Sequence, residues 1–219
     1  MKKLIINYDN LDNFCKKNDF LLIDEEMLKK ENMYKYFFYA TDNNFVGFSV
    51  YPSNMPLIIN KNVWKKLILI NNELKEQGFC ITIVDAYRPR IVQKIFWDTF
   101  YLKNGFHDEL LVANPEKYGT HNIKINAIDM LLTNIDGSKV PLPCEFDDFS
   151  IKASINYECE NKSVMENRDL LINTSKKYGL NVNVSEWWHF NDEEIQGMEY
   201  NYQNTNLIPI DDDETFYLQ

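Results

Sequence analysis

The sequence contains three histidines, and two of them, His121 and His189, stand near carboxylates. His189 lies in SEWWHF, three positions after Glu186. His121 lies in GTHNIKINAIDM, eight positions before Asp129. Two imidazoles and one carboxylate form a complete set of protein ligands for a catalytic zinc ion, which keeps its fourth position for water. His121, Asp129 and His189 are therefore candidate zinc ligands.

Each of these residues also has an ordinary interpretation. Asp129 lies in the apolar run AIDML, where a carboxylate is costly to bury unless it is paired or binds a cation. An aspartate on a strand is, however, often a hydrogen-bonded structural anchor, and a lone histidine is often a satisfied polar residue. The residues alone leave both interpretations open. His107 matches no motif and is expected on the surface.

Periodic apolar residues predict the elements that would position these groups. Each expected helix is followed by a glycine or closes at one. The third helix opens with the capping-box pattern of Ser163 and Glu166, and a turn at Asp136 and Gly137 predicts a hairpin with a return strand. The helices are expected over 62–77, 91–103 and 163–178, and the strands over 79–84, 125–133 and 181–190.

These elements do not alternate strictly, as they would in a doubly wound sheet. We therefore predict an α+β fold with a mainly antiparallel central sheet flanked by helices, and with the zinc site on the sheet. Pro89 restricts Arg88 to extended geometry, so Arg88 should lie at a strand end. The 219 residues contain no segment that resembles a linker, which predicts a single domain over 1–219.

The formal net charge of -10 disfavours nucleic acid and anionic membranes as partners, because like charges repel at long range. The start, MKKLIINYDN, has only three consecutive apolar residues, too few for a signal peptide or a spanning helix, so the protein is expected in the cytoplasm. The four cysteines form no CxxC pair, which argues against disulfides and against a thiolate zinc site.

Six segments occur together in one order: YATDNNF, DAYRP, GTHNIKINAID, EFDDF, ENRDLLINTSKKYGL and EWWHF. With them the chain resembles, over about residues 34–190, the zinc D-alanyl-D-alanine dipeptidases of the vancomycin-resistance type, a branch of the zinc D-Ala-D-Ala carboxypeptidases. The resemblance implies one zinc ion per chain held by His121, Asp129 and His189. It also implies that Glu186 is the general base and that Arg88 stabilises the oxyanion.

The resemblance further implies a small D-amino-acid dipeptide as substrate. It places Asp147 and Tyr39 near the free amino end of that dipeptide, where a carboxylate and a phenol suit an ammonium group. Asp147 could instead be an ordinary turn residue, and Tyr39 an ordinary core aromatic. Trp187 and Trp188 could wall the site, although large apolar residues beside a ligand are more often simply core.

The chain departs from the family pattern around the first ligand. Gly119 stands where the family has a serine associated with substrate recognition, and Thr120 is the candidate substitute. Seven residues separate His121 from Asp129, whereas the family pattern has six. One extra residue in a strand turns every later side chain to the other face, so a bulge or a longer turn must absorb it.

Two other functions fit the same motifs. A D,D- or L,D-carboxypeptidase acting on cell-wall peptides would need export, which the lack of a signal sequence disfavours. A catalytically silent homologue could bind zinc or a peptide without cleaving it, but it would not need Glu186. We therefore predict a cytoplasmic zinc dipeptidase that cleaves D-Ala-D-Ala or a close relative. Its oligomeric state is left open, including a homo-oligomer.

Overall fold

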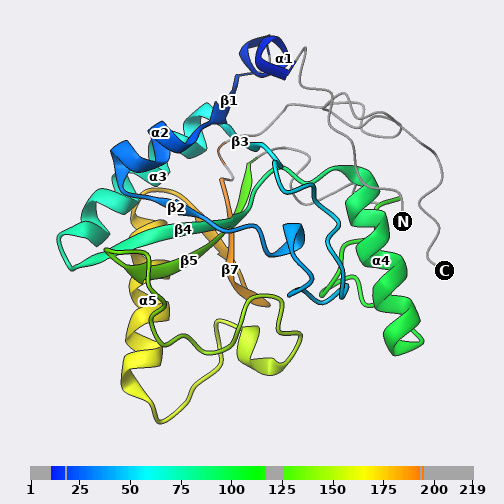
Figure 1. Cartoon of the computed structure of the whole chain (residues 1–219). Coiled ribbons are helices and arrows are strands. Elements are labelled where there is room, and N and C mark those ends of the chain that lie inside the picture. The colour runs from blue at the N-terminus through cyan, green and yellow to red at the C-terminus, as the bar shows by residue number, and fades with distance from the viewer. Residues whose placement is uncertain (1–10, 18, 117–125, 193, 195–219) are drawn as a thin grey trace.

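The chain is described by a computed structural model over residues 11–17, 19–116, 126–192 and 194, drawn in colour in Figure 1. The strands are β1 (Phe20–Ile23), β2 (Tyr34–Lys35), β3 (Leu57–Asn60), β4 (Phe79–Asp85), β5 (Ala127–Asn134), β6 (Asn181–Asn183) and β7 (Glu186–Asn191). The α-helices are α1 (Leu11–Lys17), α2 (Glu25–Glu31), α3 (Lys61–Lys75), α4 (Arg90–Asn104) and α5 (Lys162–Lys177). Short 3-10 helices form at η1 (Phe38–Ala40) and η2 (Ile151–Ala153).

Five of these strands form one sheet in the order β2-β4-β5-β7-β6, and β1 pairs with β3 in a separate antiparallel sheet. Within the larger sheet, β2 and β4 are parallel and the other neighbours are antiparallel. The predicted α+β class with a mainly antiparallel sheet is therefore confirmed for the described residues.

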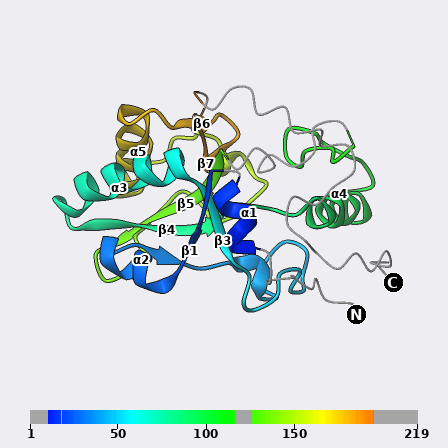
Figure 2. The same cartoon turned by 90° about the horizontal axis from the view of Figure 1, so that it is seen from above.

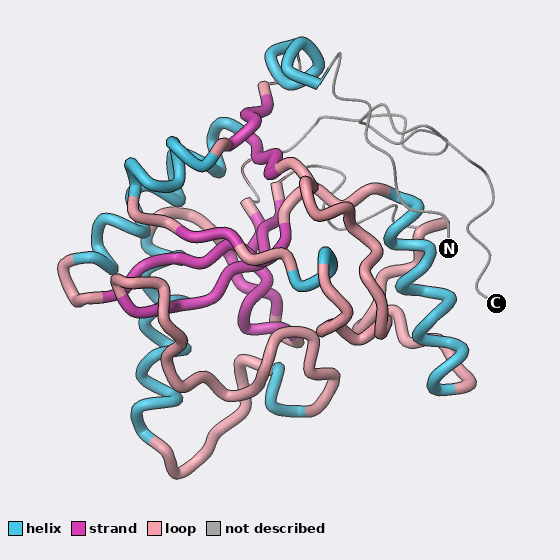
Figure 3. Tube along the Cα trace, in the orientation of Figure 1, coloured by secondary structure: helices cyan, strands magenta, loops and turns pink. Residues whose placement is uncertain are grey.

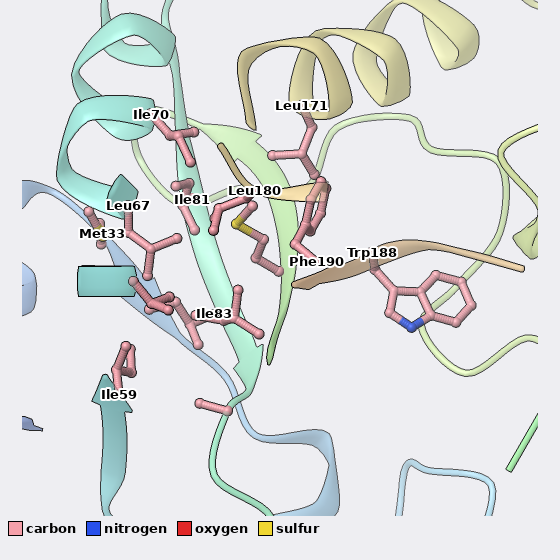
Figure 4. Packing of buried hydrophobic residues seen from close by; sticks show 14 of the residues in the cluster. Met33, Ile59, Leu67, Ile70, Ile81, Ile83, Leu171, Leu180, Trp188 and Phe190 are labelled. Atoms are coloured by element: carbon pink, nitrogen blue, oxygen red, sulfur yellow. The ribbon is translucent and has the colours of Figure 1, made fainter. Parts of the chain in front are cut away.

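Helices α3 and α5 cover one face of the larger sheet and pack against each other, whereas α4 lies on the other side of the molecule (Figures 1 and 2). Between α3, α5 and the sheet lies the main hydrophobic core, in which Ile70 of α3 and Leu171 of α5 meet Ile81 and Phe190 of the sheet (Figure 4). Burial of such side chains is the dominant force that holds helices on a sheet.

The strand β5 shows how the sheet separates core from site. Ile128, Met130 and Leu132 are fully buried in the main core. Successive side chains of a strand point to opposite faces, so Asp129 faces away from that core. A second apolar cluster, rich in aromatic residues, includes Tyr39 and the α4 residue Phe96. The candidate site lies beside this second cluster.

Long loops connect several of these elements, notably between β2 and β3 and between β5 and α5 (Figure 3). All four cysteines are free. Among the residues that the structure describes, no helix combines the length and the apolar character needed to cross a membrane.

Helices α3, α4 and α5 confirm the three predicted helices to within two residues at each end. Gly78, Gly105 and Gly179 follow them with positive φ angles of 84°, 77° and 80°, a backbone conformation that glycine adopts without steric strain. The predicted capping box is wrong, because Asn161 occupies the N-cap position, without a capping side-chain hydrogen bond, and Ser163 already lies inside the first turn.

Two strand predictions are also corrected. The turn at Asp136 and Gly137 forms, but the return segment makes only an isolated bridge between Lys139 and Thr133. Pro141 and Pro143 follow at once, and proline cannot donate to a strand ladder. The segment 181–190, predicted as one strand, is a hairpin of β6 and β7.

Candidate active site

Three acidic or basic residues form a row across the middle of the larger sheet. Asp129 on β5 is paired directly with Asp85 on β4 and with His189 on β7. The β4 pairing runs from Ile83 to Asp85 with a register shift, so Val84 is the extra residue of a β-bulge. Regular pairing would have placed Val84 opposite Asp129 and turned Asp85 toward the core. The bulge therefore brings a second carboxylate to the site.

The two predicted zinc ligands in this row are in contact. Nδ1 of His189 lies 2.7 Å from Oδ1 of Asp129, and both side chains are buried. Burial acts to lower the pKa of His189, but the charge and hydrogen bond of Asp129, together with the charge of Glu186, outweigh burial and raise that pKa. Strand pairing thus brings together an imidazole and a carboxylate that are 60 residues apart in the sequence.

Arg88 bridges the two paired carboxylates. Its Nη2 lies 2.7 Å from Oδ2 of Asp85 and 3.4 Å from Oδ2 of Asp129, while its Nε donates to Asp85 at 2.9 Å. Its Nη1 donates to Oε1 of Gln93 at 2.9 Å, and the guanidinium carbon lies 4.8 Å from the ring centroid of Phe96. Like charges on directly opposed strand residues repel, so the guanidinium is needed to hold this pair together. Arg88 lies just after β4, near the strand end as predicted.

Asp85 is fully buried, and its carboxylate is contacted by donors from three residues. Besides Arg88, the hydroxyl of Tyr51 donates to it at 2.9 Å and the backbone N–H of Ala86 at 3.0 Å. Burial raises the pKa of the Asp85 carboxyl to about 6, against the lowering effect of Arg88 and with a further rise from Asp129. These contacts fix the carboxylate that orients Arg88.

Asp147 and Tyr39, the residues predicted to hold the substrate's amino end, are in contact. The Tyr39 hydroxyl donates to Oδ2 of Asp147 at 2.5 Å. Burial raises the pKa of Asp147 to about 8, while the Tyr39 hydrogen bond and Arg88 oppose the rise and Glu186 adds to it. Asp147 also adopts a φ of 60°, a sparsely populated conformation that often occurs at functional sites.

Glu186, the predicted general base, stands at the first position of β7. Burial raises the pKa of its carboxyl to about 7; His189 opposes that rise and Asp129 adds to it. A carboxyl that titrates near neutrality can both accept and return a proton at cellular pH, as a general base requires. Its environment therefore suits the role that the motifs imply.

These groups open into one pocket of about 200 Å³. That is smaller than the roughly 300–1,000 Å³ of a typical site for drug-sized ligands, so the described walls fit a small molecule. The pocket is lined by Tyr39, Phe45, Arg88, Gln93, Phe96, Glu109, Leu110, Leu111, Val112, Ala113, Asp129, Asp147, Phe149, Asn183, Ser185, Glu186, Trp188 and His189. Trp188 thus forms part of the wall, whereas Trp187 is buried with its indole N–H on Sγ of Cys144 at 3.4 Å.

The fit of this pocket to zinc can be judged from two of the three predicted ligands. His121, like Gly119 and Thr120, lies outside the described residues. Within the described ranges, no group of three His, Cys, Asp or Glu side chains is arranged to hold a metal ion. Asp129 and His189 nevertheless offer a carboxylate oxygen and an imidazole nitrogen side by side, a donor pair that matches zinc chemistry.

Several residues of the site were not predicted. Asp85 lies inside the quoted DAYRP segment without a role, and only the bulge turns it toward Arg88. Gln93 is a polar residue on the buried side of α4, 1% exposed, and that mismatch was a usable signal. Asn183 was also missed, because it lies at the turn of a hairpin that the sequence predicts as one strand. His107, expected on the surface, is exposed and stacks on Trp97 with ring centroids 3.8 Å apart.

Comparison with known proteins agrees with this geometry. The peptidase M15 family profile, described as D-ala-D-ala dipeptidase, matches residues 31–208. A D-alanyl-D-alanine dipeptidase of Escherichia coli (strain K12) is 26% identical over 153 residues, which span 69% of this chain and 75% of that protein. Because the family profile covers well over half of the sequence, the chain belongs to the M15 peptidase family of D-Ala-D-Ala dipeptidases and is a peptidase-type hydrolase, which confirms the resemblance seen in its motifs.

Proposed function

We propose that this protein is a cytoplasmic zinc dipeptidase that hydrolyses D-Ala-D-Ala or a closely related small dipeptide. The observation that carries the proposal is the convergence of six motif residues, from five separate segments, on one small pocket. These residues are Tyr39, Arg88, Asp129, Asp147, Glu186 and His189. Family membership supports the same activity.

Asp129 and His189 would hold the zinc ion together with His121. Bound there, zinc supplies Lewis acidity to the scissile carbonyl and to the attacking water. Arg88, fixed by Asp85, places its positive charge beside Asp129 and so near the carbonyl oxygen that becomes negative in the transition state.

The remaining groups of the pocket handle protons and orientation. Glu186 takes a proton from the attacking water and returns it to the leaving amine, so that one water and one dipeptide give two amino acids. Asp147 and Tyr39 bind the free ammonium group of the dipeptide. The aromatic side chains of Phe45, Phe96 and Phe149 limit the space on the same side and exclude bulky peptides.

The test is metal analysis of purified protein followed by a hydrolysis screen of L- and D-dipeptides. We expect one zinc per chain and release of D-alanine from D-Ala-D-Ala. Glu186→Gln should lower kcat by about 10²–10⁴-fold and leave zinc content unchanged, because a base is not a ligand. Turnover of longer cell-wall peptides instead of dipeptides would identify a carboxypeptidase. Bound zinc without turnover of any short peptide would identify a silent homologue.

A further inference from the structure

The hairpin of β6 and β7 places an amide beside the proposed general base. Asn183 ends β6, Glu186 begins β7, and the two are direct partners across the two-residue turn. Directly opposed residues of an antiparallel pair have Cβ atoms about 4.5–5.5 Å apart, within reach of an amide and a carboxylate. Both side chains line the pocket.

The orientation of the Asn183 amide follows from its neighbours. Its Oδ1 accepts from the backbone N–H of Ser185 at 3.2 Å and from the Ser185 hydroxyl at 3.1 Å. Two donors on one atom identify that atom as the oxygen, which leaves the NH₂ group for other partners. That NH₂ group acts on Glu186, since the Asn183 side chain is a hydrogen-bond partner that opposes the burial-driven rise in the pKa of Glu186.

The tip of the hairpin is itself held on two sides. The carbonyl of Val184 accepts from the backbone N–H of Ile155 at 3.1 Å and from the Ser154 hydroxyl at 3.2 Å. On the other side, the Ser185 hydroxyl, whose one proton is shared between Oδ1 of Asn183 at 3.1 Å and the carbonyl oxygen of Leu110 at 3.4 Å, adds a weaker contact. Asn183 therefore belongs to a turn of fixed position, and its side chain can hold the Glu186 carboxylate in one orientation.

We propose that Asn183 is a positioning residue that holds the Glu186 carboxylate, through its side-chain NH₂ group, in the orientation from which it accepts the proton of the attacking water. The inference rests on the proposed role of Glu186 as base. Asn183 does not touch the reacting atoms in this scheme and acts only through Glu186. Other charged groups that influence Glu186 are His189, Asp129 and Arg88, together with Asp147, whose own pKa Glu186 raises.

Two substitutions separate this role from a purely structural one. Asn183→Asp keeps an oxygen for both Ser185 donors and so keeps the turn, but it presents a carboxylate oxygen to Glu186 instead of NH₂. Asn183→Ala removes both contacts. A positioning role predicts that Asn183→Asp is the more harmful change, with kcat lower by about a hundredfold against about tenfold for Asn183→Ala, and with KM nearly unchanged. A structural role predicts the reverse order, because Asn183→Asp preserves the turn.

The pH profile and an activity-independent measurement complete the test. Loss of the NH₂ donor should shift the acidic limb of kcat/KM to higher pH in both variants, and further in Asn183→Asp. The ¹³C signal of the Glu186 carboxyl, assigned with Glu186→Gln, should titrate at higher pH in purified Asn183→Asp protein. An unmoved Glu186 titration, or wild-type kcat in Asn183→Asp, would overturn the proposal. If the wild-type protein fails to cleave any dipeptide, the proposed function falls, while the carbon titration still decides whether Asn183 governs Glu186.

Discussion

In the proposed function Asp147 binds the substrate's ammonium group and must be charged, yet its surroundings favour the neutral carboxyl. Burial raises its pKa to about 8, although Arg88 and the hydrogen bond from Tyr39 pull in the opposite direction. We expect KM for D-Ala-D-Ala to fall as the pH rises toward 8, because Asp147 loses its proton. Above that pH KM should rise again, since the substrate's α-amino group titrates near about 7.7–8.0. Initial rates between pH 6 and about 9.5 would show this minimum, and a KM that is flat over the range would contradict it.

The same carboxyl gives a stability effect of opposite sign. A raised pKa means that the folded protein holds a proton that the unfolded chain has already released, so stability is lost as the pH rises from about 4 toward 8. The amide introduced by the substitution Asp147→Asn cannot ionise and can still accept from Tyr39. We expect that variant to melt at a higher temperature than wild type at pH 8 and at nearly the same temperature at pH 4. Its KM should rise about tenfold or more. Equal melting temperatures at pH 8 would show that Asp147 is not destabilised by its burial.

Among single residues, the motifs singled out Glu186 and His189, and the structure places both in the pocket, while their roles as base and ligand stay predictions. The motifs could not predict Asp85, because its direction depends on a strand register that no apolar pattern specifies. The roles of His121 and Thr120 remain predictions, since both lie outside the described residues.

At the scale of elements, Gln93 connects the start of α4 to two neighbouring segments. It accepts from Arg88 at 2.9 Å and donates from Nε2 to the carbonyl of Ala113 at 2.9 Å, while only 1% of the residue is exposed. Gln93→Leu would leave both partners buried without this contact. We expect it to lower the free energy of unfolding by about 1–3 kcal/mol and to reduce kcat, because Arg88 loses a restraint.

Gln93→Glu is the matched control, since it retains an acceptor for Arg88 and removes the donor to Ala113. Urea denaturation and steady-state kinetics of the two variants would separate the contacts. If kcat falls in the leucine variant and is largely retained in the glutamate variant, the contact with Arg88 is the important one. Unchanged kcat in Gln93→Leu would show that Asp85 and Asp129 alone suffice to orient the guanidinium.

Elements with strong periodicity were predicted well, and those defined by local side-chain contacts were not. The apolar spacing of α3, α4 and α5 gave their positions because each packs one face on an apolar cluster. The turn between β6 and β7 was missed because its signal is an asparagine that bonds to the residue two positions later, not a glycine. The start of α5 was predicted one residue late, because the capping-box pattern of Ser163 and Glu166 lies inside the helix and Asn161 precedes it.

At the scale of the whole molecule, an acidic protein gathers four carboxylates around one small pocket. The pocket is lined by the acidic residues Glu109, Asp129, Asp147 and Glu186. Among the described lining residues, the basic ones are Arg88 and His189. A bound divalent cation would relieve the repulsion among the carboxylates, and any ion that binds only the folded state stabilises it. We expect removal of metal by a chelator to lower the melting temperature by about 5 °C or more and added zinc to restore it.

Variants identify where the metal acts. Glu186→Gln should keep the response to zinc, because Glu186 is proposed as a base, whereas Asp129→Ala should lose it. Thermal denaturation with and without chelator measures both. The same response in Asp129→Ala and wild type would place the stabilising ion elsewhere in the molecule.

The bulge at Val84 has a consequence for how relatives of this chain are aligned. In a chain that lacked this one residue, the aspartate after Ile83 would fall opposite Asp129 by ordinary alternation, on the same face as here. A one-residue deletion just before DAYRP would therefore leave the aspartate and the arginine in the same place on the sheet. It would change only the number of residues between this motif and the preceding one. Spacing rules that demand a fixed number of residues there would discard true homologues.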